Sequence, residues 1–280
     1  MIKKTSLMLF SMAVWASAQQ RVDELRTRQL WDDTLLEKRP SPAKTPATRK
    51  PQSRPLNGAL VGVTVWRLRP SNPGDTREVR ALIHEDGGEA EWTPERVSAG
   101  APLAEGQKVR ISTEIAQEGY LYVIDRDEYA DGTKGDARLI FPTLRMRGGD
   151  NRVTPGMVVE VPAPEDKPPY FKVTRSRPDQ INEELTFLIS PKRLAELKIG
   201  WEPLKVDEDQ LARWAKQWKA QSHKLEDAAQ EGKVYTVAEK EAARGGKLLT
   251  RDDPLPQTMY YVDSKAGDVV MLEVPLRIAK

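Results

Sequence analysis

The sequence predicts a mainly β protein: an antiparallel β-sandwich or barrel-like domain with one long amphipathic helix and a C-terminal hairpin. Three observations lead to this fold class. Short segments alternate apolar and polar residues with a period of two, as half-buried strands do. Turn signals rich in Gly, Asp, Asn and Pro separate these segments. No part of the chain shows the strand–helix alternation that a parallel βαβ sheet requires.

The N-terminus has the three parts of a secretory signal peptide. Lys3 and Lys4 form a positive start, residues 5–15 are uncharged and mostly apolar, and residues 16–18 (Ala-Ser-Ala) are small. The apolar run is shorter than the about 20 residues that span a bilayer, although an uncleaved anchor is the alternative. We expect cleavage near Ala18, a mature chain without a transmembrane segment, and a secreted or periplasmic location.

Two further segments precede the main domain. Residues 19–38 carry apolar side chains about three and four residues apart, which predicts a short, weakly amphipathic helix. Residues 39–55 hold five prolines and five basic residues but no acidic one, which predicts an extended, solvated linker. A strap of this kind could lie on an anionic envelope polymer, and a charged tether explains the same composition.

The main β domain is expected over residues 56–192. Residues 61–65 and 109–115 alternate apolar and polar side chains, which predicts strands with one buried face. Residues 120–124 and 185–189 are apolar on both faces, as central strands between two layers are. Short strands separated by turns favour the antiparallel sandwich or barrel-like arrangement.

Residues 193–280 are expected to add a helix and a hairpin that pack on the main domain. The helix is predicted over Glu208–Ala229, where apolar residues follow one helical face and Asp207 is a plausible N-cap. Its Trp214 and Trp218 either pack on the sheet or form a docking face, and packing is the commoner use.

The end of the chain predicts a second short helix and the hairpin. Val237–Ala243 has the composition of a short helix and precedes two glycines. Residues 259–263 and 269–276 read as two strands joined by a turn. We expect this hairpin to join the main sheet, because an isolated hairpin is marginally stable in water.

Composition excludes several classes of function. The chain of 280 residues contains no cysteine, so disulfides, thiolate catalysis, cysteine metal sites and a lipidated N-terminal cysteine are all excluded. Its formal charge of +2 comes from Lys3 and Lys4, which leave with the signal peptide. The neutral mature chain gives no electrostatic reason to expect nucleic-acid binding.

The chain carries no recognisable catalytic motif. It has no H-E-x-x-H, G-x-S-x-G, P-loop or G-x-G-x-x-G pattern. Its two histidines are His84, at a predicted strand end, and His223, in the predicted long helix, and neither has a local serine and acid signature. We therefore expect no enzyme and no cofactor, although two carboxylates alone would suffice for a glycosidase.

One acidic cluster is a candidate calcium site. Five carboxylates fall within 12 residues after a predicted buried strand that ends at Asp125: Asp125, Asp127, Glu128, Asp131 and Asp136. Calcium takes about six to eight oxygen ligands from flexible loops, and exported proteins meet abundant calcium. The spacing differs from that of an EF-hand, however, so a solvated loop between strands is the alternative.

One basic cluster is a candidate anion site. Its residues surround and follow a Gly-Gly-Asp-Asn turn: Arg145, Arg147, Arg152, Lys172, Arg175 and Arg177. Glycine-rich backbone beside arginines can hold an anion. A loop that joins two strands explains the same residues and is the favoured interpretation.

Several blocks of the main domain occur in the order found in a known family. They are residues 119–125 (Gly-Tyr-Leu-Tyr-Val-Ile-Asp), 139–142 (Leu-Ile-Phe-Pro) and 151–153 (Asn-Arg-Val). Over about residues 95–192 the chain resembles the domain of unknown function 4384. The resemblance implies a β-rich domain of secreted bacterial proteins, found beside signalling or peptidase modules. No such module is recognisable in this chain.

These observations lead to one main hypothesis and two alternatives. The main one is an exported, soluble, non-catalytic binding or scaffold module of the cell envelope, whose partner is an unknown protein or envelope polymer. The first alternative is a calcium-stabilised adhesion or structural domain. The second is an envelope hydrolase that uses paired carboxylates. The sequence indicates neither a ligand nor an oligomeric state.

Overall fold

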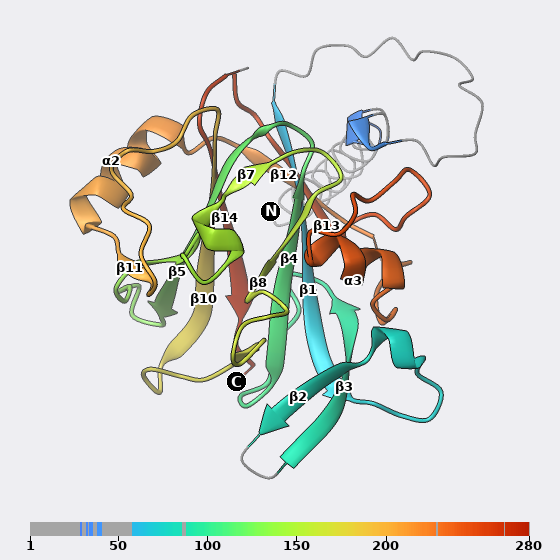
Figure 1. The fold of residues 1–280 in the computed structure, drawn as a ribbon. Helices are drawn as coiled ribbons and strands as arrows, with labels where there is room; N and C mark the ends of the chain where they lie inside the picture. The colour runs from blue at the N-terminus through green and yellow to red at the C-terminus, as the bar shows by residue number, and fades with distance from the viewer. Residues whose placement is uncertain are drawn as a thin grey trace, which may run out of the picture.

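The strands form two antiparallel sheets that pack face to face, as the computed structural model shows (Figure 1). The structure describes residues 29, 32, 34–35, 38–40, 58–85, 88–227, 229–265 and 267–279, with backbone alone at 84 and 85. The mainly β fold class is confirmed, and of the two expected arrangements it is the sandwich that forms. The expected signal peptide lies outside the described residues.

The first sheet is built around one long strand. β1 pairs with β13 and then with β3 along one edge, and with β4 along the other. β4 in turn pairs with β8 and β9, while β2 extends the sheet from β3 and β12 extends it from β13. The bounds of its strands are β1 Ala59–Pro70, β2 Ala81–Glu85, β3 Gly88–Val97, β4 Lys108–Ile115, β8 Val158–Val161, β9 Phe171–Lys172, β12 Ser222–Glu226 and β13 Thr258–Val262.

The second sheet is built around β5 and β10, which pair along their whole length. β14 pairs with the other edge of β10, whereas β6 and β7 share the other edge of β5, and β11 pairs with β6. The bounds of its strands are β5 Gly119–Tyr129, β6 Arg138–Phe141, β7 Arg152–Val153, β10 Gln180–Ser190, β11 Leu204–Lys205 and β14 Val270–Arg277.

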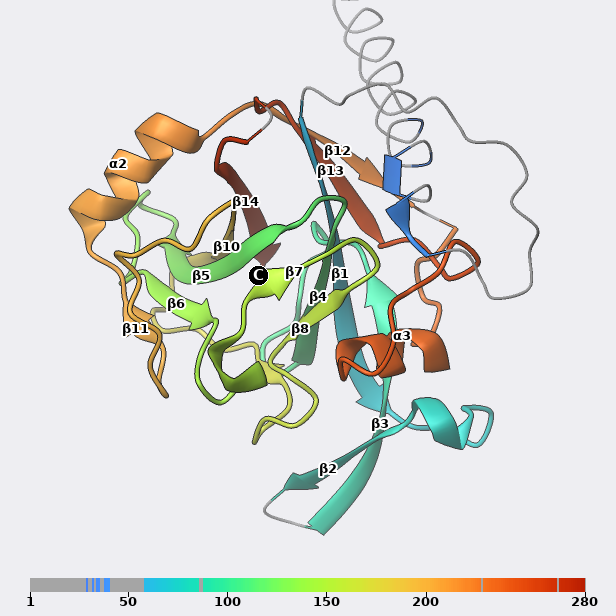
Figure 2. The same ribbon diagram turned by 45° about the horizontal axis from the view of Figure 1, so that its top comes forward.

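The main core lies between the two sheets and follows from the alternation in the sequence. Val63 and Ile111 of the first sheet and Val123, Phe187 and Leu272 of the second all belong to one buried apolar cluster. Residues one position away on each strand point to the outer faces, because successive side chains of a strand lie on opposite sides. The β2–β3 hairpin extends beyond this core (Figure 2).

Helices cover the outer face of each sheet. α2 (Glu208–Trp218) lies on the second sheet, where Trp214 packs with Tyr122 and Leu188. α3 (Val237–Ala243) lies on the first sheet and begins with a capping box (Figure 1). Two 3-10 turns are also present, η1 over Arg77–Val79 and η2 over Arg147–Gly149. No helix among the described residues has both the length and the apolar character needed to cross a membrane.

The long helix is shorter than the sequence predicts. Asp207 is its N-cap and accepts a hydrogen bond from the Gln210 backbone N–H at 2.9 Å, as expected. The helix ends at Trp218, not at residue 229, because Lys219 is extended and residues 222–226 form the edge strand β12 instead. Trp214 stacks on Trp218 with 5.4 Å between ring centroids and is 2% exposed, which confirms that this pair packs on the sheet.

The predicted C-terminal hairpin does not form. Both of its strands exist, but β13 belongs to the first sheet and β14 to the second, so residues 263–269 cross from one sheet to the other. All five residues of β13 are buried, and β1 and β12 pair with its two edges. A strand buried on both faces and paired on both edges has no edge free for a hairpin partner. Residues 193–280 therefore contribute strands to both sheets of the main domain.

The start of the predicted linker is buried. The described residues between 29 and 38 are helical, in line with the short N-terminal helix, and Leu35 is fully buried. Arg39, the first residue of the predicted solvated linker at 39–55, is 1% exposed because it forms an ion pair with Glu114 of β4. The prediction was wrong at this residue, and the remaining linker residues from 41 onward lie outside the described residues.

Candidate functional site

The structure distributes the predicted calcium ligands over both sides of a strand. β5 does not end at Asp125 but continues to Tyr129, because β10 pairs with it along this whole stretch. Alternation places Asp125 and Asp127 on the face toward the first sheet and Glu128 on the opposite face. There Glu128 accepts a hydrogen bond from the Asn182 side chain at 2.7 Å.

The last two predicted ligands have partners of their own. Asp131 accepts hydrogen bonds from Thr133 and Arg177, and these lower the pKa of its carboxyl to about 2. Asp136 lies 2.8 Å from Lys205, and this contact lowers its pKa. Within the part of the chain that the structure describes, no group of three or more Asp, Glu or His side chains could hold a metal ion. The calcium site stays a prediction, with no preformed geometry to support it.

A different set of carboxyl groups comes together on the inner face of the second sheet. Glu183 of β10 lies directly opposite Asp127 of β5, and Asp125 is two residues further along the same face. Burial, together with the charges of Asp125 and Asp127, raises the pKa of Glu183 to about 8. Burial, with a contribution from Asp127, raises the pKa of Asp125 to about 6.

The three carboxyl groups have unequal surroundings. Asp127 accepts hydrogen bonds from Tyr129 at 3.2 Å, Ser176 at 2.7 Å and Gln180 at 2.7 Å. The Oδ1 atom of Asp125 is buried without a hydrogen-bond partner among the described residues. Carboxyl groups whose surroundings separate their pKa values can divide the roles of proton donor and proton acceptor. This set can therefore hold a proton at neutral pH.

A hollow of about 410 Å³ opens beside α2. We call it the α2 hollow, and its lining residues are Glu196, Leu197, Lys198, Leu204, Lys205, Val206, Asp207, Gln210, Arg213 and Trp214. Lys205 is engaged with Asp136, and Asp207 caps the helix. Lys198 and Arg213 form no ion pair with any described residue. The hollow thus combines apolar side chains with two cations that have no acidic partner among the described residues.

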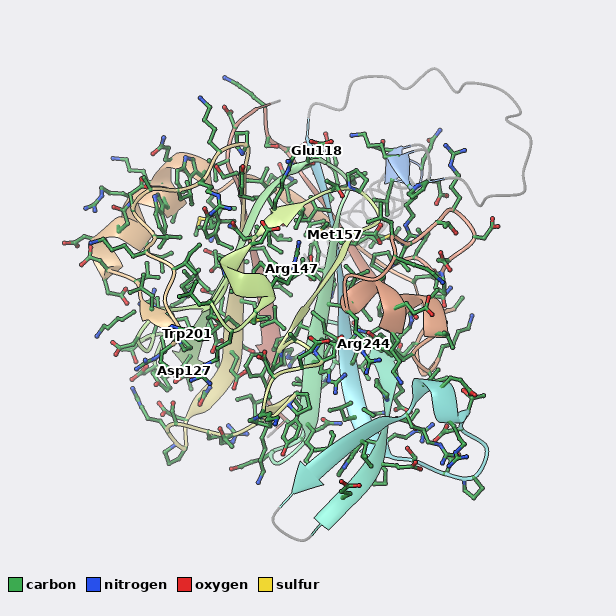
Figure 3. The ribbon with its side chains drawn as sticks, viewed as in Figure 1. Glu118, Asp127, Arg147, Met157, Trp201 and Arg244 are labelled. Carbon is green, nitrogen blue, oxygen red and sulfur yellow. The ribbon has the colours of Figure 1, made fainter. Side chains whose placement is uncertain are left out.

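An exposed tryptophan stands between the two chain segments that line the α2 hollow. Trp201 is 65% exposed and lies at the left of the molecule in Figure 3. Its loop is held in place because the carbonyl of Gly200 accepts a hydrogen bond from the Leu144 N–H at 2.8 Å. Arg145 and Glu202 form an ion pair beside it. The tryptophan is therefore presented to solvent on a fixed loop.

Buried ionic groups join α3 and the segment before it to the first sheet. Tyr235 donates a hydrogen bond of 3.0 Å to Glu160 of β8, and Arg110 lies 3.8 Å from the other carboxylate oxygen. Burial raises the pKa of Glu160 to about 7, against the opposing effects of Arg110 and Tyr235. Arg96 and Glu239 form a second buried pair. A cavity of about 20 Å³ beside Tyr235 and Glu239 has room for about one water molecule.

The predicted basic cluster consists mostly of arginines with acidic partners. The ion pairs are Arg145 with Glu202, Arg147 with Asp150, Arg152 with Glu118, Arg175 with Glu105, and Arg177 with Asp131 and Asp179. The remaining member, Lys172, lies in β9. Asn151 is fully buried and donates to the carbonyl of Leu121 at 3.0 Å, which fixes the loop to β5. These contacts support the structural interpretation of the loop.

His223 forms no hydrogen bond with a serine in the part of the chain that the structure describes. His223 lies in β12, 3.4 Å from Asp263, and stacks on Tyr261. His84 lies in the edge strand β2, and its side chain is outside the description.

Comparisons with known proteins add no relatives. No family model matches the chain, and searches of curated proteins and of solved structures found no match either. The resemblance to the domain of unknown function 4384 therefore stays a prediction.

Sequence reasoning missed Glu183 and the α2 hollow. Glu183 is 56 positions from Asp127 along the chain and becomes its neighbour only through the register of β10 with β5. The sequence did contain one signal for Glu183. It lies on the same strand face as the apolar residues Leu185 and Phe187, and this alternation predicts that its side chain points toward the core. The hollow had no such signal, because its lining comes from a loop, a two-residue strand and a helix.

Proposed function

We propose that the protein is an exported binding module of the cell envelope and that the α2 hollow is its ligand site. The observation that carries this proposal is the joining of apolar lining to the cations Lys198 and Arg213, which have no acidic partner among the described residues. Sites for small ligands span roughly 300–1,000 Å³ and combine apolar lining with a few polar groups. The α2 hollow, at about 410 Å³, has this size, and its lining combines four apolar residues, Leu197, Leu204, Val206 and Trp214, with a larger number of polar and charged ones.

The lining favours a ligand with an apolar body and one anionic group. Asp207 caps the helix, so Glu196 is the acidic lining residue that has no cap or ion pair among the described residues, and the cations Lys198 and Arg213 outnumber it. Trp201 offers an additional aromatic surface on the adjoining fixed loop. Tryptophan side chains often anchor ligands because they bury a large area at little entropic cost.

The test uses 1-anilinonaphthalene-8-sulfonate, an aromatic anion, as the probe. We expect the folded mature protein to bind it with saturation, and Arg213→Glu to weaken binding by at least about tenfold, which corresponds to about 1.4 kcal/mol. Lys216→Glu is the matched control, because it makes the same charge change on the same helix outside the α2 hollow. Equal effects of the two substitutions would refute the proposed site.

Export is the second part of the proposal and rests on the residue pattern of the N-terminus. Expression of the full chain in a Gram-negative host should yield a mature protein that begins at Gln19, because the small residues 16–18 precede it. Intact-mass measurement of the purified protein checks this. A protein that retains Met1 through Ala18 would contradict the export proposal while leaving the ligand site untouched.

One observation favours a second candidate function, the carboxylate-based envelope hydrolase. Asp127 and Glu183 face each other, and the pKa of Glu183 is raised to about 8, as a general acid requires. The test is release of dye from labelled peptidoglycan by the wild type and by Glu183→Gln. Activity that the substitution abolishes would establish this candidate, and no activity above a buffer blank would remove it.

A further inference from the structure

The guanidinium of Arg39 is enclosed by acceptors on every side. Its Nε donates to Glu114 Oε1 at 2.8 Å, and one Nη2 hydrogen reaches Glu114 Oε2 at 2.5 Å. The other Nη2 hydrogen reaches the carbonyl of Pro254 at 3.2 Å, and Nη1 donates to the carbonyls of Thr250 and Asp253 at 3.0 and 2.9 Å. All five N–H donors of the arginine are thus satisfied. We call this arrangement the guanidinium pocket.

The groups that form the guanidinium pocket are held in place by hydrogen bonds that do not involve Arg39. Glu114 belongs to β4, which is paired on both edges. The carbonyl groups come from a turn that Asp253 braces, since its carboxylate accepts hydrogen bonds from the Thr250 N–H at 2.6 Å and hydroxyl at 2.8 Å. A site whose acceptors are held by their own bonds is preorganised for its ligand.

A second anchor lies one helical turn away. Leu35 is fully buried in an apolar socket, whose other members are Leu60, Ala116, Leu225, Met259 and Tyr261. The Arg39 N–H donates to the Leu35 carbonyl at 2.8 Å, so the two residues lie on one face of a helix. Leu35 and Arg39 are thus two anchors that attach the N-terminal helix to the first sheet.

We propose that this socket and the guanidinium pocket form a peptide-binding site for a helix that presents leucine and arginine four residues apart. Leu35 and Arg39 of the chain occupy the site in cis, and the partner that it fits is the segment carrying the same two residues in a second copy. Every copy carries these two anchors, joined to β1 by the 19 residues 40–58. Copies that exchange this segment would therefore form a dimer without any new contact.

The site should discriminate arginine from lysine. The planar guanidinium matches both carboxylate oxygens of Glu114 and still reaches three carbonyl groups. A lysine ammonium has three donors on a single atom and cannot form this fork. Because the resident segment belongs to the same chain as the site, its effective concentration there is about a millimolar, and it excludes competitors at lower concentrations.

The experiment uses a fluorescent peptide of residues 29–40 as a stand-in for the segment of a second copy. We expect the mature Leu35→Ala/Arg39→Ala chain to bind this peptide with saturation, as measured by fluorescence anisotropy. The wild-type chain should bind at least about 100-fold more weakly, because its own segment fills the site. The same peptide with Arg39→Lys should also lose about 100-fold in affinity for the variant chain.

Two results would overturn the proposal. One is the absence of peptide binding by a folded variant chain, with folding checked by circular dichroism. The other is equal affinity for the arginine and lysine peptides. If the variant chain does not fold, the wild type is cut in its folded state at a protease site introduced between residues 41 and 57. The labelled peptide must then replace the cut segment, and failure to exchange counts equally against the proposal.

Discussion

Glu183 of β10 and Asp127 of β5 lie directly opposite each other, with both carboxyl groups on the face toward the first sheet. Like charges at opposed positions of a ladder destabilise a sheet. The structure reduces this repulsion by keeping Glu183 protonated, because burial and the neighbouring acids raise its pKa to about 8. The stability of the second sheet is therefore linked to pH through this pair.

We predict that stability falls as the pH rises toward 8. The folded-state pKa of Glu183 lies above the ordinary value of 4.5, so the folded protein holds a proton that the unfolded chain releases. The favourable contribution is complete below about pH 4.5 and is lost as the pH passes through the folded-state pKa. Glu183→Gln should remove much of this dependence and stabilise the protein by about 1–3 kcal/mol at pH 8.5.

The measurement is urea unfolding of both proteins at intervals from pH 5 to pH 9. Glu184→Gln is the matched control, because Glu184 is the next residue and pairs with Lys134 at 2.6 Å on the opposite face. We expect this control to retain the pH dependence of the wild type. A Glu183→Gln protein with the same pH dependence as the wild type would show that Glu183 is ionised in the folded state.

Calcium should leave the stability of the protein unchanged. The predicted ligands Asp125 and Asp127 lie on one face of β5 and Glu128 on the other, so no described set of acids forms a site. A bound ion would raise the unfolding temperature by mass action. Thermal unfolding in about 1 mM calcium, compared with chelator, checks this, and a higher midpoint with calcium would restore the calcium-stabilised alternative.

Removal of the Tyr235 hydroxyl group should weaken the attachment of α3 and the segment before it to the first sheet. Tyr235→Phe deletes the hydrogen bond to Glu160, whose pKa burial has already raised to about 7. We expect a loss of about 1–2 kcal/mol in the free energy of unfolding, larger at pH 8 than at pH 5, because the ionised carboxylate needs the donor more. Tyr260→Phe is the control, since no hydrogen bond of the buried Tyr260 hydroxyl is present among the described residues. Equal losses from both substitutions would contradict the prediction.

The sequence predicted the strands and the core well, because period-two alternation reports directly which face of a strand is buried. It extended the helix too far, since Leu225 falls on the helical spacing of Trp214 and Trp218 as well as on the alternation of β12. It could not show that β13 and β14 join different sheets, because pairing partners depend on the whole topology. The sequence predicted a solvated Arg39 for the same reason. Its buried partner Glu114 is 75 residues away along the chain.

Substitution of one glycine should test the close approach of two loops. Gly156 has a φ of +82°, and a Cβ atom there would lie 2.7 Å from the Leu249 carbonyl oxygen. The Leu249 N–H donates to the Gly156 carbonyl at 2.7 Å, so the two backbones are bound together and cannot separate freely. Gly156→Ala should therefore add a steric cost of about 1–3 kcal/mol to the strain of its backbone conformation.

Gly106 provides the matched control for that strain. Its φ of +83° is nearly the same, but a Cβ atom at Gly106 would meet nothing within 4 Å. Gly106→Ala should cost about 1 kcal/mol through backbone conformation alone. The difference between the two variants in denaturant unfolding thus isolates the contact with Leu249. Equal stabilities would mean that the loop carrying Leu249 moves aside, which would also displace the turn whose carbonyl groups bind Arg39.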